Sequence, residues 1–327
     1  MTLYKVSKQG LSEVSRDRFA TELEIQQLVE TNVDSIFNLE LISSEFMIGD
    51  FRLDSLCWDG EAKSFVIIEY KRGTSYSVID QGYSYLSTML NNKAEFILEF
   101  NEKMDTSLKR NQVDWTQSRV IFVAPTFNSY QKNSVNFRDV PFELWEIKRF
   151  AGDLVSFEQH VSSSSESIAA VERGSTAVSK VSAEVKQYDE SSALEQSTDQ
   201  VKQLWNALRS RLSELEGTTL HFSKTQISLK TGNNSRTGVV GFSFSKSSIR
   251  AWIHRGNLYP DGTKTGWYGW FTLDDPKKIC RINESKSNVR RKTERHQIVY
   301  YVFNIKSVEE IDYAMLLINQ KHRSVLS

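Results

Sequence analysis

The sequence contains no apolar run that approaches the roughly 18–20 residues a membrane-spanning helix needs. Its first five residues lack the basic and apolar regions of a secretory signal. The two cysteines, Cys57 and Cys280, have no CxxC spacing, which excludes a disulfide framework and a cysteine-based zinc site. We therefore expect a cytoplasmic protein with no membrane partner.

Net charge is also absent, because 41 Lys and Arg residues balance 41 Asp and Glu residues. The balance hides an asymmetry: residues 1–160 hold 17 basic against 24 acidic residues, whereas residues 216–327 hold 18 against 9. Acidic residues can hold a cation and basic residues can contact a polyanion. The asymmetry favours such a division of labour, although chance also produces differences of this size between two domains.

The 327 residues are too many for one small core and predict two domains. Residues 161–199 include four consecutive serines and contain Tyr188 as their single aromatic residue. This composition buries too little apolar surface to offset chain ordering, so we expect a linker with at most transient helix. The expected parts are a first domain over residues 1–160, a Ser-rich linker over 161–199 and a second domain over 200–327.

Apolar spacing predicts both helices and strands in the first domain, which is therefore expected to be α/β. Residues 3–6 and 11–14 predict a hairpin, and helical spacing recurs over residues 21–37 and 78–90. Strands are expected over residues 40–45, 49–58, 64–71, 120–123 and 142–148. Asp59-Gly60 is the expected turn between the second and third of these strands.

The second domain is expected to be a smaller α+β unit. Its first and last segments, residues 198–215 and 308–321, have helical spacing. Between them lie short strand-like runs over residues 225–229, 239–244, 249–253 and 299–303.

The expected hairpin of residues 49–58 and 64–71 carries a polar cluster. Alternate side chains of a strand share a face, so Glu69 and Lys71 point the same way and the hairpin brings Asp54 near Glu69. Mg²⁺ or Mn²⁺ would satisfy the two carboxylates, because their oxygens are hard ligands. The Lys71 ammonium could orient or deprotonate a water, or stabilise charge on a phosphate. The alternative is a surface ion pair across the hairpin.

The spacing of Asp54, Glu69 and Lys71 resembles the signature of the PD-(D/E)XK nuclease superfamily. Residues 20–100 resemble one branch of it, the archaeal and actinobacterial mismatch-specific or single-strand endonucleases and their bacterial relatives. The matching pieces, in chain order, are Glu30-Thr31-Asn32, Ser44-Glu45-Phe46, Arg52-Leu53-Asp54, Ile68-Glu69-Tyr70-Lys71-Arg72 and Gln81-Gly82-X-X-Tyr85. Several motifs in the same order are more specific than the triad alone.

The resemblance implies a restriction-endonuclease-like core, a four-stranded mixed sheet flanked by helices. Asp54 and Glu69 would be ligands of Mg²⁺ or Mn²⁺, and Lys71 would be the catalytic lysine. Gln81 would position water or phosphate, and Glu30 would be the first-helix carboxylate that completes such a site.

Several residues near this cluster have two explanations each. Glu22, Glu24 and Glu45 compete with Glu30 for the role of further carboxylate, and all four could be ordinary exposed acids. Arg72 follows the catalytic lysine and is expected to contact phosphate if it has a role.

A polar helix face supplies another expected contact. Tyr85 lies one helical turn from Gln81 and is expected to contact nucleic acid. Polar groups on a helix face are, however, more often solvated than functional.

The second domain interleaves aromatic and basic residues between positions 252 and 296. Aromatic faces can stack on bases and cations can follow phosphates, so nucleic acid is the expected partner. The basic run expected to contact it comprises Arg290, Arg291, Lys292 and Arg295. The alternative is that each aromatic residue belongs to the core. This part resembles the small C-terminal domain of bacterial proteins labelled predicted transport proteins, a label that no membrane segment supports here.

The favoured function is a metal-dependent endonuclease that acts on DNA, in defence against foreign DNA or in repair, with DNA preferred to RNA from the resemblance alone. Modules of this kind often pair, so a homodimer is compatible with the prediction. The alternative is a catalytically silent nucleic-acid-binding or scaffolding protein that keeps the nuclease fold. The intact Asp54, Glu69 and Lys71 argue against it.

Overall fold

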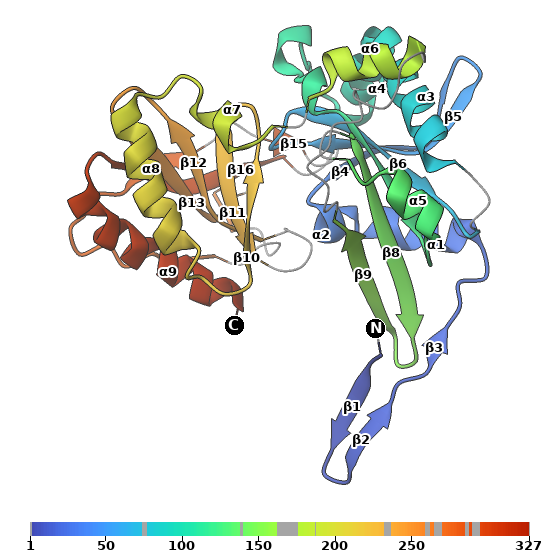
Figure 1. Cartoon of the computed structure of the whole chain (residues 1–327), viewed down its shortest axis with the longest axis horizontal. Helices are drawn as coiled ribbons and strands as arrows, with labels where there is room; N and C mark the ends of the chain where they lie inside the picture. Colours follow the sequence, from blue (N-terminus) through green and yellow to red (C-terminus); the bar gives the residue numbers. More distant parts are fainter. Residues whose placement is uncertain are drawn as a thin grey trace. The chain divides into compact units, whose positions relative to one another are not determined.

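The computed structural model describes residues 2–73, 77–137, 140–161, 176–186, 188–231, 237–258, 262–264, 270–284, 288–289 and 295–326. The chain divides into two compact units. The first comprises Met1–Glu99 and Leu108–Gln187, and the second comprises Phe100–Ser107 and Tyr188–Ser327. Each unit is built on its own β-sheet with helices packed against it (Figure 1).

The sheet of the first unit is mixed. In order across the sheet its strands are β3 (Arg16–Asp17), β8 (Phe142–Phe150), β7 (Arg119–Ala124), β6 (Ser64–Tyr70), β5 (Phe51–Asp59) and β4 (Glu40–Ile48), and β9 (Leu154–His160) also pairs with β8. Strands β6, β7 and β8 run parallel, and the other pairs are antiparallel. The expected mixed sheet is confirmed, but four strands was too few. Hairpins add β4 beside β5 and β9 beside β8, and the short β3 also joins β8.

Helices lie on both faces of this sheet. They are α1 (Glu22–Thr31), α2 (Val33–Phe37), α3 (Val78–Asn91), the Lys93–Glu99 part of α4 (Lys93–Met104), α5 (Ser129–Ser134) and α6 (Thr176–Glu184), with short 3₁₀ turns η1 (Arg110–Gln112) and η2 (Trp115–Gln117). On one face, Ile25 and Val29 of α1 share a core with Ile68 and the thiol-bearing Cys57 of the sheet. On the other face, α3 packs against β7.

The single helix expected over residues 21–37 is two helices. The first begins with a capping pair, because Thr21 accepts a hydrogen bond from the amide of Glu24 while the Glu24 carboxylate accepts one from the amide of Ala20. It ends at Asn32, whose backbone leaves the helical region and whose side chain donates to the carbonyl of Leu28. Such a local side-chain bond competes with helix continuation.

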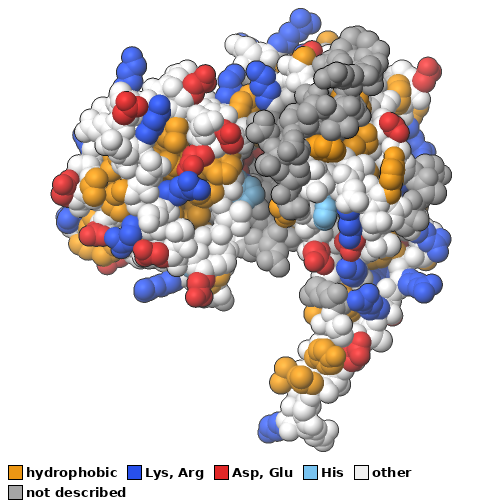
Figure 2. Space-filling model, viewed as in Figure 1, with side chains coloured by type: hydrophobic (Ala, Val, Ile, Leu, Met, Phe, Trp, Pro, Cys, Tyr) orange, Lys and Arg blue, Asp and Glu red, His pale blue; other side chains and the backbone are white. Residues whose placement is uncertain are grey.

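The N-terminal hairpin is confirmed. Strands β1 (Tyr4–Ser7) and β2 (Gly10–Glu13) pair in antiparallel register, and every residue of both strands is exposed. Hydrophobic side chains are therefore in contact with solvent along this hairpin, as Figure 2 shows. They belong to Tyr4, Val6 and Leu11.

Part of the expected linker is helical. Within residues 161–199, α6 packs against α3 and buries Val178 and Val181. A second helix, α7 (Glu190–Leu194), buries Leu194 in the core of the second unit. The serine run and the rest of residues 162–175 lie outside the described residues. The domain boundaries themselves stay a prediction.

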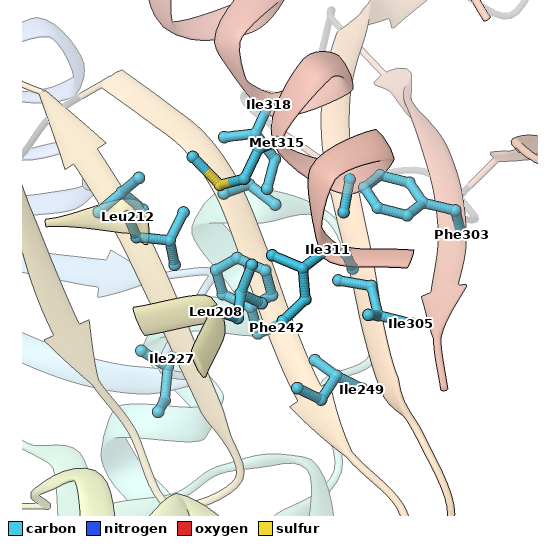
Figure 3. Close-up of a cluster of buried hydrophobic side chains, with 14 of the residues drawn as sticks. Leu208, Leu212, Ile227, Phe242, Ile249, Phe303, Ile305, Ile311, Met315 and Ile318 are labelled. Carbon is cyan, nitrogen blue, oxygen red and sulfur yellow. The ribbon is translucent and has the colours of Figure 1, made fainter. Parts of the chain in front are cut away.

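The second unit is an antiparallel sheet with helices, as the expected α+β class requires. In order its strands are β10 (Thr218–Phe222), β11 (Gln226–Thr231), β12 (Thr237–Phe244), β13 (Ile249–Leu258), β16 (Arg295–Ile305) and β14 (Arg281–Glu284), and β15 (Asn288–Val289) also pairs with β16. Helices α8 (Asp199–Leu212) and α9 (Ile311–Leu326), the latter preceded by the turn η4 (Val308–Glu310), pack on one face of it. Figure 3 shows Leu208 and Ile311 of these helices against Phe242 and Ile249 of the sheet.

The described helices offer no candidate for a membrane span, since none is both long and apolar enough to cross a bilayer.

One buried cation in the second unit has an energetic cost. Lys321 of α9 is only 6% exposed, and its Nζ lies 4.8 Å from the ring centroid of Phe271. No acid pairs with it among the described residues. Burial lowers the pKa of Lys321 to about 8, because a desolvated ammonium is disfavoured.

We expect Lys321→Met to raise the free energy of unfolding at pH 7 by roughly 1–3 kcal/mol, because the folded-state pKa lies below the unfolded one. In the wild type the cost of the buried charge falls as pH rises from about 8, where the folded protein loses this proton, toward 10.5, where the unfolded chain loses it as well. Urea denaturation at pH 7 and pH 10 measures both effects. A variant less stable than the wild type at both pH values would show that the Phe271 contact outweighs desolvation.

Candidate functional site

The candidate site lies at the carboxyl end of β6, where a wholly buried strand ends in a carboxylate. Every residue of β6 is buried, and Glu69 is 3% exposed. Its Oε1 atom accepts hydrogen bonds from Lys71 Nζ at 2.6 Å and from Gln81 Nε2 at 2.7 Å. One oxygen of the carboxylate is thus satisfied by a cation and an amide.

The second carboxylate comes from the neighbouring strand. Ser55 of β5 pairs with Ile68 of β6, so Asp54 and Glu69, one residue further along, face the same side of the sheet. The Oδ2 atom of Asp54 accepts a hydrogen bond from the backbone amide of Tyr70 at 3.0 Å. Burial, and then the negative charge of Glu69, raises the pKa of Asp54 to about 7.

The other oxygen of Glu69, Oε2, is buried and accepts no hydrogen bond of ordinary geometry from the described residues. The Tyr85 hydroxyl also interacts with the Glu69 carboxylate, which contributes to the raised pKa of Tyr85. A buried carboxylate oxygen without a donor is costly, and here a second carboxylate lies nearby. A cation bound between Asp54 and Glu69 would remove both costs.

These residues fit a divalent cation with few protein ligands. Within the described ranges, no three His, Cys, Asp or Glu side chains form a metal-binding group. Mg²⁺, however, is often held by one or two carboxylates, with water and substrate phosphate as its remaining ligands. The buried Oε2 atom of Glu69 beside Asp54 meets this requirement for Mg²⁺ or Mn²⁺.

Glu30 lies apart from this pair. Its Oε1 atom accepts hydrogen bonds from Ser55 Oγ at 2.6 Å and from Gln26 Nε2 at 3.0 Å. Ser55 also bonds the hydroxyl of Tyr70, on the sheet face that α1 covers. The structure therefore brings Asp54, Glu69, Lys71 and Gln81 together and places Glu30 behind them.

Gln26 is a site residue that the sequence reasoning missed. It is 6% exposed, and its Nε2 atom lies within 3.2 Å of four oxygen atoms. These belong to the side chains of Glu30, Ser44 and Glu45 and to the backbone carbonyl of Asp54. The sequence does contain a sign of this role: Gln26 places a polar amide on the apolar stripe of the helix, three residues before Val29.

Glu45 has an unusual backbone conformation next to the site. Its φ of 54° lies in the left-handed region, which costs a non-glycine residue free energy. Its carboxylate forms an ion pair with Arg52 Nε at 2.9 Å, and its charge contributes to the raised pKa of Asp54. Of the three competing acids, Glu45 thus lies nearest to the site.

The carboxylates of the other two competing acids accept hydrogen bonds from backbone amides. Glu24 caps α1, and the Oε1 atom of Glu22 accepts a hydrogen bond from the amide of Arg72 at 2.7 Å. The Arg72 side chain is exposed.

Tyr85 is an internal contact of the site. Its hydroxyl accepts a hydrogen bond from Gln81 Nε2 at 2.8 Å, and the residue is 7% exposed. Burial raises its pKa, and the charge of Glu69 adds to the effect. Tyr85 therefore fixes the orientation of the Gln81 amide, and its ring lies against Phe51.

The basic and aromatic residues of the second unit are only partly described. Arg290, Arg291 and Lys292 lie outside the described residues, and Arg295 begins β16 with no side chain described. Two cations lie over the ring of Trp270, with Arg255 Cζ and Lys264 Nζ at 4.7 and 4.8 Å from its centroid.

Comparison with known proteins gives one full-length relative. No family model matches the chain. An uncharacterized protein of Haemophilus influenzae is 36% identical over 322 residues, which cover 98% of this chain and 99% of that protein.

Two solved structures are similar over part of the chain. They are the EndoMS–dsDNA2 complex, at 18% identity and a TM-score of 0.27, and a repair endonuclease from Pyrococcus abyssi, at 19% and 0.21. The first match covers 44% of this chain and 60% of that one, and the second covers 36% and 44%. With scores this low, neither superposition establishes a shared fold.

Gly82, the residue after Gln81, allows α3 to pack closely against the sheet and so helps to set the position of Gln81. A Cβ atom at Gly82 would lie 2.5–2.9 Å from three ring atoms of Phe142 in β8. We expect Gly82→Ala to push α3 away from the sheet and to lower the free energy of unfolding by about 1–3 kcal/mol.

Helix propensity alone would give the opposite sign, since Ala is favoured over Gly by up to about 1 kcal/mol. Urea denaturation measures the difference, with Ser84→Ala on the same helix as the control. A Gly82→Ala variant as stable as the wild type would show that α3 adjusts at no cost.

Proposed function

We propose that this chain, which belongs to the same family as the Haemophilus influenzae protein, is a metal-dependent endonuclease that hydrolyses phosphodiester bonds of DNA. The observation that carries the proposal is the buried Oε2 atom of Glu69, which lies beside Asp54 and accepts no hydrogen bond of ordinary geometry from the described residues. A buried carboxylate pair can hold Mg²⁺ or Mn²⁺ with substrate phosphate as a further ligand, and the adjacent lysine and amide supply donors for phosphodiester hydrolysis.

Each of the four residues has a role in this proposal. Asp54 and Glu69 would hold the cation, which supplies Lewis-acid stabilisation of charge on the phosphate when it is bound. Lys71, fixed by its 2.6 Å contact with Glu69, would place a positive charge where the attacked phosphate becomes more negative. Gln81, held between Glu69 and Tyr85, would orient the attacking water or a phosphate oxygen.

The hydrolysis balances without a further reactant. The oxygen of a water molecule bonds to phosphorus, and the ester bond on the opposite side breaks. The water loses one proton and the leaving oxygen gains one, so the products are a phosphate monoester and a hydroxyl. Lys71, which carries the exchangeable protons nearest to the carboxylates, is the candidate for proton transfer.

The charge distribution supports nucleic acid as the substrate. The basic excess of residues 216–327 fits a polyanion, whereas the acidic first half fits a cation site. DNA is proposed before RNA on the sequence resemblance. Arg72, exposed next to Lys71, is proposed as a phosphate contact.

The catalytic test compares plasmid and single-strand cleavage in Mg²⁺ or Mn²⁺ for the wild type, Glu69→Gln and Lys71→Ala. We expect each variant to lose at least roughly tenfold in rate, because each removes a group that acts on the reacting phosphate or its cation. Glu61→Gln, an exposed acid in the turn of the same hairpin, is the matched control and should cleave like the wild type. Equal rates in all four proteins would favour the scaffolding alternative.

Metal binding has a readout separate from activity. We expect Mn²⁺ at about a hundredfold above its dissociation constant to stabilise the wild type by about 2–3 kcal/mol, because it binds only the folded site. The shift in melting temperature between EDTA and Mn²⁺ should be lost in Glu69→Gln and kept in Glu61→Gln. Equal shifts in the wild type and Glu69→Gln would place the cation elsewhere.

A further inference from the structure

The sheet of the second unit has one face that α8 and α9 leave uncovered. The apolar side chains of its strands point to the helices, so alternate residues point to the opposite side, which we call the open face. Cross-strand register places Gly241 of β12, Trp252 of β13, Val302 of β16 and Arg281 of β14 in one row across this face.

The indole ring of Trp252 lies over Gly241 of the neighbouring strand on the open face. A Cβ atom at Gly241 would lie 2.3–2.5 Å from three atoms of the indole ring, so the ring crosses the space that a larger residue would fill. The side chain is half-buried. A half-buried indole laid over a glycine presents part of its ring face outward.

Polar and aromatic groups surround this indole. His254 and Tyr300 face each other across β13 and β16 in the next row, with ring centroids 5.7 Å apart. Arg250 lies two residues from Trp252 on the same strand and is exposed, as is Arg281 at the far end of the row. Three aromatic rings and two guanidinium groups thus lie on three neighbouring strands.

The strands of this sheet contain a single acidic residue. Strands β10, β11, β12, β13 and β16 contain no Asp or Glu, and the single acid of β14, Glu284, pairs with the core residue Val299 on the helix side. An ordinary solvent-facing sheet mixes both signs. A face with cations and without acids is complementary to a polyanion.

We propose that the open face binds single-stranded nucleic acid, with bases stacked on Trp252 and on the His254–Tyr300 pair and phosphates on Arg250 and Arg281. A duplex keeps its base faces inside the helix, so only an unpaired strand can use a flat aromatic surface. The inference deepens the proposed function and rests on it in one respect, since it takes the nuclease substrate as the polyanion bound here.

Binding is measured in EDTA, where the proposed cleavage does not occur. Fluorescence anisotropy of the full chain is followed with a labelled single-stranded DNA of about 20 nucleotides, the same sequence as RNA, and the DNA duplex. We expect the wild type to bind the single strands more tightly than the duplex. Trp252→Ala should weaken single-strand binding roughly tenfold or more, because it removes the contribution of one stacked base. Trp252→Phe keeps an aromatic face and should retain most of the binding.

A charge-reversal pair tests the same face without touching the aromatic residues. Arg250→Glu with Arg281→Glu should weaken binding and reduce its salt dependence, because two phosphate contacts are lost. Lys202→Glu with Arg323→Glu makes the same change in charge on α8 and α9, which cover the opposite face, and should bind like the wild type. Both pairs alter solvent-accessible side chains, and thermal melting checks that all variants fold.

Three results would overturn the inference: no binding by the wild type, binding unaffected by Trp252→Ala, or equal losses in the two charge-reversal pairs. A duplex bound as tightly as the single strands would also contradict it. Binding in EDTA is read separately from cleavage, which needs the cation. Binding that depends on Trp252 without metal-dependent cleavage would therefore support nucleic-acid binding by the open face and reject the proposed function. Metal-dependent cleavage that is unaffected by Trp252→Ala would support the proposed function and reject nucleic-acid binding by the open face.

Discussion

The structure of the first unit depends on a carboxylate that is buried at the end of a strand. Strand β6 is covered on both faces, so Glu69 takes its charge into the interior of the unit. Every contact around it serves that charge: Lys71 neutralises it, Gln81 donates to it, and Tyr85 holds Gln81 in place. Asp54 on the adjacent strand adds to the cost instead of relieving it. A fold selected for stability alone would place an apolar residue here.

Local pattern was sufficient to predict most elements, and tertiary packing explains those it did not. The β5–β6 hairpin and α3 follow from a turn and from clear apolar spacing, and both were predicted to within a few residues. Strand β9 was missed because its residues are exposed or half-buried throughout, with no buried alternation to detect. Helix α6 was missed because Val178 and Val181 are buried only against α3, a contact that no composition argument contains.

The residues of the candidate site likewise fall into those that local pattern predicts and those that tertiary packing places. Glu69 and Lys71 share a strand, and Asp54 reaches them through one short turn, so their proximity could be read from spacing. Gln26 acts across 28 residues on the carbonyl of Asp54, and its place depends on how α1 crosses the sheet. Glu30 was expected beside the carboxylates, but the same crossing directs it to Ser55. Which face of the sheet a helix covers is decided by the whole core, not by the helix sequence.

The N-terminal hairpin has a different consequence. Two strands joined only to each other are marginally stable in water, and here neither buries a side chain. The free energy needed to open them is therefore small compared with that of either core. Their backbone amides should exchange with deuterated solvent long before those of β6 or β13, and a protease should cut there while the remaining chain stays folded. The protein thus combines a segment that should open at a low free energy cost with two buried cores whose amides should open at a higher one.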